Sequence, residues 1–580
     1  MKEQTANKKA PPGIFSLLTP YRGMIILLIL FALLGNGLNL WLPKIIGNGI
    51  DAYNDGNFLY KPIIIKFSAA AFIIFIFTWL QNIIQTYVSE LVARNLRTKI
   101  ADKISRQSYA WIEGNNPSRL LTNLTADVDS IKLFVSQAIV SMVSSIFIII
   151  GASILLLIID WKLALAVIAI LPIMGITFYV VLRKVRSLFI KSREIMDWLN
   201  KVINESILGA ALIHVINSQQ MEYDKFLSAN VKAMNFGLSI LKLFAGLIPV
   251  ITFTANMAGL TILALGGHYV INGSMSLGDF AAFSSYLSLL IFPILVIGFM
   301  SNVIAQATAS YQRISTVLAT PDTPVAGTLT KTLDGNITLE DVTVTYGEKP
   351  ALKHISFDIK AGSKIAVIGP TAAGKTQLLY LLTGLIKPGS GSIEIDGHPV
   401  ESYNSESFYS QVGFVFQDSI IFNMSIRENI AFSDTVTDES LEKAITTAEL
   451  KEFIDTLPDK LSTIISERGT SLSGGQKQRI MLARALAINP RILLLDDFTA
   501  RVDTNTERKI LENVQKNYPD LTLISVTQKI ASVEHYDQII LLMEGEMIGR
   551  GTHDDLMRTS PEYMQIFQSQ QSTSNYELQS

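Results

Sequence analysis

Two stretches of the chain combine the residue types that can hold phosphate groups. In SKIAVIGPTAAGKTQLLYLL, an apolar run leads into a loop that fits G-x-x-x-x-G-K-[ST], and a helical pattern follows. In such a loop, backbone N–H groups and the start of the helix bind phosphate oxygens, and Gly374 lets the chain approach closely. Lys375 can reach the β- and γ-phosphates, and the Thr376 hydroxyl can bind Mg²⁺. The loop residues that we expect at a nucleotide are Gly369, Pro370, Thr371, Ala372, Ala373, Gly374, Lys375, Thr376 and Gln377.

The second stretch, RILLLDDFTARVD, ends an apolar run in two adjacent carboxylates, Asp496 and Asp497. Asp496 is placed to hold Mg²⁺, directly or through water. A solvated carboxylate at a strand end is the alternative, and the phosphate loop upstream argues against it.

Between these stretches, TSLSGGQKQRIMLARAL opens an amphipathic helix on a serine and two glycines. This composition at a helix N-terminus forms a second phosphate-binding cap. An ordinary glycine turn is the alternative, but the helix and the ILLLDD run that follow argue against it. The residues that we expect in this cap are Ser473, Gly474, Gly475 and Gln476.

Short β-branched runs must position these loops. After the Pro/Gly/Thr-rich linker TPDTPVAGTLTKTLDG, the runs ITLEDVTVTY, SKIAVIG, GFVFQ, ILLLDD and LTLISVT alternate with helical patterns. This alternation predicts an α/β domain with a largely parallel sheet. We place the linker at 316–336, the α/β nucleotide-binding domain at 337–570 and a polar tail at 571–580.

The first half of the chain is strongly apolar. Of 580 residues, 49% are hydrophobic, and the mean hydropathy of +0.34 is too high for an ordinary soluble protein. Six stretches each have about the length that a bilayer-spanning helix needs, so we predict a membrane domain of six transmembrane helices over 1–315. The first stretch is too long for a cleaved signal peptide. The stretches are 24–46, 63–88, 135–159, 163–183, 244–271 and 279–305.

Lysine and arginine predict the orientation of these helices. They gather between the second and third stretches and between the fourth and fifth, whereas the connections DAYNDGNFLYK and DWK carry few. By the positive-inside rule, the two basic segments and both termini are cytoplasmic. A net charge of −2 suggests no nucleic-acid partner, and the absence of cysteine excludes disulfides and thiol chemistry.

With its LSGGQ signature, the chain resembles an exporter-type half-transporter of the ATP-binding cassette (ABC) family over nearly its full length. The resemblance implies ATP and Mg²⁺ as cofactors. It also implies that Tyr346 stacks on adenine, although an ordinary strand tyrosine is the alternative, and that Gln417 contacts Mg²⁺ beside Thr376 and Asp496. The Glu-Arg-Gly of SERGTSLSGGQ would lie near coupling helices, which TADVDSI and NESILGA would flank. Family domains work head to tail, with each ATP between the phosphate loop of one and the signature of the other.

Three departures from the family pattern surround one phosphate site. Asp497 stands where the family has a glutamate that polarises the attacking water, and its side chain is one methylene shorter. General-base action needs hydrogen-bond reach, so a displacement of about 1 Å is costly. Gln528 replaces the histidine that contacts the γ-phosphate, and it cannot become a cation. The loop pattern Ser-Ala-Leu-Asp reads Ala-Arg-Val-Asp over 500–503. In the phosphate loop, Ala372 replaces a usual glycine, which we expect to perturb the loop only mildly.

The departures predict a degenerate site that binds ATP and hydrolyses it poorly, whereas the intact signature would serve the site of a partner. We therefore expect a heterodimer with a different half-transporter that moves a small or amphipathic, lipid-like substrate by alternating access. The alternatives are an ATP-gated channel or regulatory subunit, a peripheral ATPase and an importer. We expect a multi-pass protein of the bacterial inner membrane, with the nucleotide-binding domain in the cytoplasm. The substrate cannot be read from the polar residues within the spans.

Overall fold

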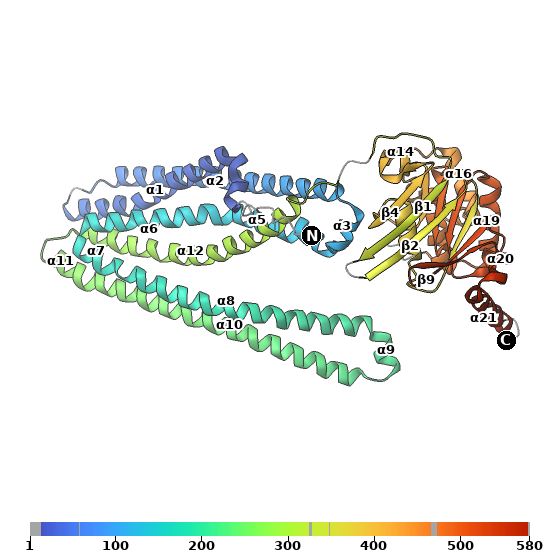
Figure 1. Ribbon diagram of the computed structural model, residues 1–580. Coiled ribbons are helices and arrows are strands. Elements are labelled where there is room, and N and C mark those ends of the chain that lie inside the picture. Colours follow the sequence, from blue (N-terminus) through green and yellow to red (C-terminus); the bar gives the residue numbers. More distant parts are fainter. Residues whose placement is uncertain (1–12, 57, 324–326, 347–348, 466–471, 578–580) are drawn as a thin grey trace. The chain divides into compact units, whose positions relative to one another are not determined.

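The computed structural model describes residues 13–56, 58–323, 327–346, 349–465 and 472–577. The chain forms two compact units, each of which is considered by itself (Figure 1). The first consists of Met1–Arg106 and Asn115–Asp322, and the second of Gln107–Gly114 and Thr323–Ser580.

The first unit is built of helices. Five helical stretches in the described residues are long and apolar enough to cross a membrane: Ile14–Asn54, Tyr60–Ser105, Pro117–Ile159, Gln219–Ile271 and Leu277–Leu318. Their large apolar side chains are often exposed, as the hydrocarbon of a bilayer requires. The helices are α1 (Arg22–Asn54), α2 (Tyr60–Ser105), α4 (Pro117–Thr122), α5 (Val128–Leu133), α6 (Ile139–Ile159), α7 (Trp161–Ile168), α8 (Ile170–Leu208), α9 (Ala210–Val215), α10 (Gln219–Thr261), α11 (Gly267–Ile271) and α12 (Leu277–Leu318). The 3-10 helix η1 (Ile14–Tyr21) precedes α1, and the π-helical turns are η2 (Asn123–Asp127), η3 (Phe134–Ala138) and η4 (Ile262–Gly266).

The predicted span at 163–183 is divided between α7 and α8. The two helices meet at Ala169, and Pro172 lies in the first turn of α8. Because proline has no N–H, it suits the start of a helix and not its interior. No sixth helix in the described part of the chain meets the length and composition of a span, so the count of six stays a prediction.

Two groups of helices are visible in the first unit. α8 and α10 lie side by side, and α1, α2, α6 and α12 pack against one another (Figure 1). Polar contacts tie the end of α1 to the start of α12: Asp51 accepts from the Ser276 hydroxyl and the Gly278 N–H, both at 2.7 Å. The Lys44 ammonium lies 2.7 Å from the Asp279 carboxylate.

The second unit contains two sheets, which confirms the predicted α/β pattern. A four-stranded antiparallel sheet has the order β2-β1-β4-β5, and a six-stranded sheet has the order β10-β9-β3-β8-β7-β6. In the larger sheet only the β9–β10 pair is antiparallel. The strands are β1 (Ile337–Tyr346), β2 (Lys349–Ile359), β3 (Lys364–Ile368), β4 (Ser390–Ile395), β5 (His398–Pro399), β6 (Val412–Val415), β7 (Ile492–Asp496), β8 (Thr522–Val526), β9 (Gln538–Met543) and β10 (Glu546–Gly551).

Helices cover both faces of the parallel strands, so these strands are apolar throughout. Along β7, Ile492 and Leu494 pack with α13, whereas Leu493 and Leu495 pack with α18 and α19. The helices are α3 (Tyr109–Gly114), α13 (Lys375–Leu382), α14 (Ser405–Tyr409), α15 (Ile426–Ile430), α16 (Asp438–Thr447), α17 (Lys451–Asp455), α18 (Gly474–Ala487), α19 (Thr504–Asn517), α20 (His553–Thr559) and α21 (Pro561–Glu577). The short 3-10 helices are η5 (Val400–Ser402), η6 (Lys460–Ser462), η8 (Phe498–Arg501) and η9 (Ile530–Ser532).

Candidate functional site

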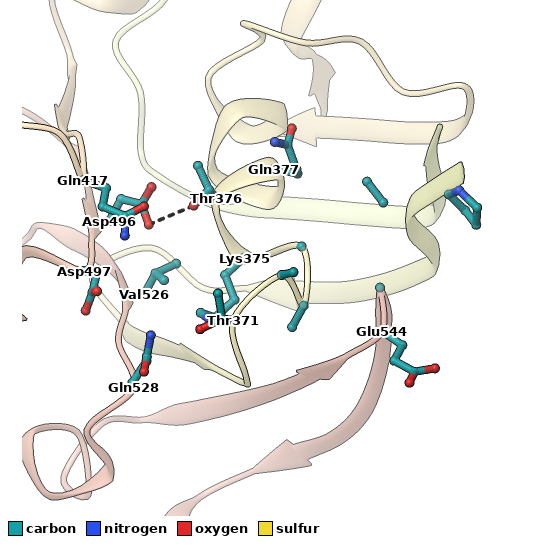
Figure 2. A pocket seen from close by; sticks show the side chains of 16 residues that line it. Thr371, Lys375, Thr376, Gln377, Gln417, Asp496, Asp497, Val526, Gln528 and Glu544 are labelled. Carbon is teal, nitrogen blue, oxygen red and sulfur yellow. Dashed lines mark hydrogen bonds between the residues drawn. The ribbon is translucent and has the colours of Figure 1, made fainter. Parts of the chain in front are cut away.

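Strand order brings the predicted phosphate and metal residues together. β3, β8, β7 and β6 are consecutive parallel neighbours, so their carboxyl ends meet at one edge of the sheet. The phosphate loop follows β3, Gln528 follows β8, Asp496 and Asp497 end β7, and Gln417 follows β6. A ligand in an open α/β sheet binds at this edge. A pocket of about 470 Å³ lies there and is lined by residues 371–377, Gln417, both aspartates and Gln528 (Figure 2).

The phosphate loop folds tightly onto the start of α13. Gly374 has a φ of 95°, and a Cβ at this position would lie 2.6 Å from the carbonyl oxygen of Ala351. Any side chain here would therefore both strain the backbone and collide with β2. The close approach expected of Gly374 thus has a steric reason, and it leaves the first N–H groups of α13 facing the pocket.

The Lys375 ammonium is held inside the loop. It donates to the carbonyl oxygens of Gly369 at 2.7 Å and Pro370 at 2.8 Å. Burial lowers the pKa of Lys375, while the two nearby aspartates oppose this shift. A phosphate in the pocket would add negative charge beside this buried cation, which favours its charged form.

Ala372 adopts a left-handed conformation, with a φ of 66°. For a residue with a Cβ, this conformation costs about 1–2 kcal/mol. Glycine at the same position would carry no such strain. The mild perturbation expected from the sequence did not include this cost, because the sequence alone does not reveal the φ of the loop.

Asp496 has the environment of a metal ligand. Its side chain is buried, one carboxylate oxygen accepts from the Thr376 hydroxyl at 3.3 Å, and the other has no hydrogen-bond partner among the described residues (Figure 2). Burial raises the pKa of Asp496, partly offset by the Thr376 hydrogen bond. A buried carboxylate oxygen without a partner is costly unless a cation or water meets it. Mg²⁺ prefers such oxygen ligands and retains water and phosphate ligands, so Asp496, Thr376 and Gln417 fit this ion. No cluster of three His, Cys, Asp or Glu side chains occurs among the described residues.

Asp497 and Gln528 face the same pocket from neighbouring strands (Figure 2). The backbone N–H of Asp497 donates to the Val526 carbonyl at 3.0 Å, and its φ of 47° turns the chain sharply into η8. Neither side chain makes a hydrogen bond to another described residue. The pocket thus presents a short carboxylate and a neutral amide beyond the phosphate loop.

The start of α18 is a separate arrangement. Ser473 caps this helix: its hydroxyl accepts from the Gln476 N–H at 3.2 Å, and the Gln476 side chain accepts from the Ser473 N–H at 2.8 Å. This reciprocal capping box fixes the helix N-terminus. None of residues 473–476 lines the 470 Å³ pocket, so the two predicted phosphate-binding regions of this chain do not share one cavity.

The altered loop after the two aspartates lies against α18. A Cβ at Gly475 would meet the Arg501 carbonyl oxygen at 2.9 Å, and one at Gly474 would meet the Arg501 side chain at 3.2 Å. Glycine at both positions thus allows the loop to approach the helix start. This proximity was not predicted from the sequence, because only the fold brings η8 back to α18.

Some expected residues lie outside the described parts. The backbone of Tyr346 ends β1 and pairs with Lys349, but its side chain lies outside the described residues. The Glu-Arg-Gly at 467–469 lies outside them too. Sequence reasoning also missed the pocket residues Glu544 and Gly545, which reach the phosphate loop because β9 pairs with β3. Nothing in the MEGEM turn signals this neighbour.

A short helix from the apolar half of the sequence belongs to the second unit. In α3, the Tyr109 ring meets the Tyr380 ring on α13 edge to face, with centroids 5.5 Å apart. Tyr380 also contacts Phe414 and Phe416, on either side of the end of β6. Burial and the nearby Tyr109 raise the pKa of Tyr380. The phosphate-loop helix is therefore in contact with the segment between α2 and α4.

Two family models match the chain. The model described as the ABC transporter transmembrane region matches residues 25–294, and the model described as ABC transporter matches residues 352–500. The second match includes the phosphate loop, the capped helix start and both aspartates.

The chain is similar to several bacterial proteins over most of its length. It is 34% identical to the uncharacterized ABC transporter ATP-binding protein YfiB of Bacillus subtilis, over 85% of this chain and 86% of that protein. It is 30% identical to the probable multidrug resistance ABC transporter ATP-binding/permease protein YheI of the same organism, over 94% of each chain. Its fold resembles a bacterial Atm1-family ABC exporter with ATP bound, with a TM-score of 0.79, 24% identity, and coverage of 95% of this chain and 98% of that one.

Proposed function

The chain belongs to the ABC transporter family, and from this premise we propose that it is the degenerate-site subunit of a heterodimeric ATP-driven exporter. The observation that carries the proposal is the pocket itself. It retains Lys375, Thr376 and Asp496, which suit a nucleotide and Mg²⁺, but it presents Asp497 and Gln528 where hydrolysis is carried out in this family. We retain the division into a membrane domain at 1–315, a linker at 316–336, a nucleotide-binding domain at 337–570 and a tail at 571–580.

Binding of ATP uses the phosphate loop and the start of α13. The N–H groups of residues 371–376 surround the phosphates, and Lys375 exchanges its two backbone carbonyl partners for phosphate oxygens. Thr376, Gln417 and Asp496 would hold Mg²⁺, which would neutralise charge on the phosphates. The stacking of Tyr346 on the adenine stays a prediction, because this side chain lies outside the described residues.

Hydrolysis in this pocket is slow because the attacking water is poorly positioned. The Asp497 carboxylate is one methylene short of the glutamate that it replaces, and phosphoryl transfer depends chiefly on position and electrostatics. Gln528 can donate a hydrogen bond to a phosphate oxygen, but it adds no positive charge. The site therefore keeps its affinity for ATP and loses most of its turnover.

The start of α18 serves the site of the partner. Ser473, Gly474, Gly475 and Gln476 form a capped N-terminus with exposed or half-exposed residues and lie outside the chain's own pocket. A different half-transporter supplies the phosphate loop, glutamate and histidine opposite them. ATP binding closes the two nucleotide domains, and hydrolysis in the competent site lets them separate. The contact between Tyr109 and Tyr380 is one route by which closure reaches the membrane helices.

The protein is a multi-pass membrane protein, and we assign it to a bacterial inner membrane with its nucleotide-binding domain in the cytoplasm. Its cargo is small or amphipathic, and a lipid-like molecule fits the apolar spans. The similarity to YheI, a probable multidrug resistance transporter of Bacillus subtilis, supports this substrate class.

The test compares the ATPase activity of the purified chain with that of the reconstituted pair. The chain alone should turn over ATP about 10²-fold or more slowly than the pair, because general-base catalysis is typically worth about 10²–10⁴-fold. The partner is the half-transporter that copurifies with a tagged form of this chain. A rate for the chain alone that equals the rate of the pair, per site, would overturn the proposal.

A further inference from the structure

The C-terminal helix α21 makes direct contact with the backbone that carries Gln528. The Gln570 side chain uses both ends of its amide: Nε2 donates to the Gln528 carbonyl at 2.6 Å, and Oε1 accepts from the Ile530 N–H at 3.0 Å. These two hydrogen bonds hold the main chain at Gln528 and at Ile530, on either side of Lys529. Because they involve main-chain atoms, they set the position of the loop whatever side chain stands at 528.

The helix that bears Gln570 is firmly attached to the domain. The Tyr563 side chain is fully buried and its hydroxyl lies 2.8 Å from His553 Nδ1. Ile566 and Phe567 pack against the core formed around α18 and α19. The packing of α21 therefore fixes the position of Gln570 relative to the rest of the domain.

The loop is anchored at both ends and exposed in between: the Thr527 and Ile530 side chains are buried, whereas the Gln528 and Lys529 side chains are exposed. It follows β8, where the Thr527 N–H donates to the Val367 carbonyl at 3.2 Å. Gln528 lines the phosphate pocket on one side, and Gln528 and Lys529 line a second cavity, of about 1180 Å³, between α19 and α21. Because the Gln528 side chain lies between these two open volumes, packing does not fix its position, and the hydrogen bonds to its main chain do so instead.

We propose that Gln570 is a positioning residue that holds Gln528 at the phosphate pocket and thereby determines how firmly this chain retains ATP. Without the two bonds, the loop can shift toward the second cavity and carry Gln528 away from the phosphate. The inference rests on the proposed function, since it requires that a nucleotide occupies the pocket.

The test measures ATP retention with a photoreactive ATP analogue on the full chain in nanodiscs, in the cold. Gln570→Ala should weaken labelling about three- to tenfold, the effect of one lost hydrogen bond at the nucleotide. Gln570→Glu keeps the acceptor for the Ile530 N–H but sets a carboxylate against the Gln528 carbonyl, so it should weaken labelling at least as much. Gln568→Ala is the matched control, because Gln568 is an exposed glutamine on the same helix that makes no hydrogen bond to the described residues.

A double-mutant cycle distinguishes positioning from a structural role. If Gln570 acts through Gln528, then Gln570→Ala should change labelling less than twofold in a Gln528→Ala background. An equal loss in both backgrounds, or no loss in the wild-type background, would overturn the inference. If the Gln570→Ala variant does not fold, the same double-mutant cycle is measured with Gln570→Glu in its place.

Lys375→Ala separates this inference from the proposed function. If Lys375→Ala abolishes labelling while Gln570→Ala leaves it unchanged, the inference fails and the nucleotide site stands. If Lys375→Ala leaves labelling unchanged, the pocket is not the labelled site, and both fail.

Discussion

The pocket at the strand ends and the start of α18 are the two regions that we propose to bind phosphate, and they depart from the family pattern to different degrees. Both present the N-terminus of a helix that follows glycine. The pocket is lined by Lys375 and Asp496, to which we assign phosphate and metal, and by Asp497 and Gln528, at the positions where we expect the family to act on water. The start of α18 keeps its capping box intact. In our proposal, the residues that bind are retained in both regions, whereas the residues that catalyse differ in the pocket.

The two regions are less independent than their separate sequences suggest. Arg501, in the altered loop that follows the aspartates, covers Gly474 and Gly475 at the start of α18. A change in this loop can therefore move the residues at the start of α18 that we propose to serve the partner's site. Four predictions test whether the two regions differ in their contribution to ATP binding and hydrolysis.

The largest effect should come from the start of α18. In the reconstituted pair, Gly475→Asp should reduce steady-state ATPase about 10²-fold or more, because the new side chain meets the Arg501 carbonyl and brings a negative charge to the phosphate site. Ser473→Ala removes the cap and should also suppress turnover. Asp497→Asn should change the rate less than about twofold. If Asp497→Asn abolished turnover while ATP still bound, the aspartate would be the working base, and the comparison between the regions would collapse.

Repair of the pocket should give the next largest effect. Asp497→Glu combined with Gln528→His should raise the ATPase of the chain alone about 10²-fold, because general-base catalysis is typically worth at least this factor. Each single substitution should raise the ATPase rate much less, because the residues at 497 and 528 act together on the same water and phosphate. The measurement is the rate of phosphate release by the wild-type chain, the two single variants and the double variant. Equal rates for both single variants and the double variant would count against the idea of a joint defect.

The pH dependence of the metal site should follow the raised pKa of Asp496. A metal ligand must be deprotonated, so Mg²⁺-dependent ATP labelling should fall on acidification at a pH above the value of about 3.9 for ordinary aspartate. Without metal the sign is opposite: the folded state binds this proton more tightly, so acidification through the same window should stabilise the protein.

Asp496→Asn supplies the control for this pH profile. It should weaken Mg²⁺-dependent labelling at every pH and remove the stabilisation seen on acidification in EDTA. Thermal unfolding in EDTA measures the stability of the metal-free protein, and photolabelling in the presence of Mg²⁺ measures ATP binding at each pH. A metal-free protein that lost stability on acidification, to the same extent in wild type and Asp496→Asn, would show that Asp496 does not control this window.

The smallest effect should come from the phosphate loop. Ala372→Gly should raise the free energy of unfolding of the nucleotide domain by up to about 1 kcal/mol, because it relieves a residue with a φ of 66°. Ala373→Gly is the matched control and should destabilise, since Ala373 is buried and does not have a positive φ. Thermal unfolding of the full chain measures both. A loss of stability for Ala372→Gly as large as that for Ala373→Gly would show that the loop is not strained at 372.

Much of the fold could be predicted because its signals are local. The β-branched runs predicted five of the strands, β1, β3, β6, β7 and β8, from period and length alone. The apolar stretches predicted the five spans that the described residues contain. The single span predicted at 163–183 is divided between α7 and α8. Apolarity alone did not reveal this division, because the apolar residues continue across the helix break near Pro172.

What the sequence by itself determined is the chemistry to be expected of each loop: glycine and lysine for phosphate, an aspartate for a metal, and a serine with two glycines at the start of a helix. These depend on residue types a few positions apart, where the chain has little freedom. What only the tertiary structure decided is which loops meet. The order β3-β8-β7-β6 gathers the pocket, β9 adds Glu544 to it, Arg501 returns to α18, and Gln570 reaches the backbone of Gln528. The physical reason is that such contacts join residues distant in sequence, and strand pairing and the packing of both faces of the sheet select them.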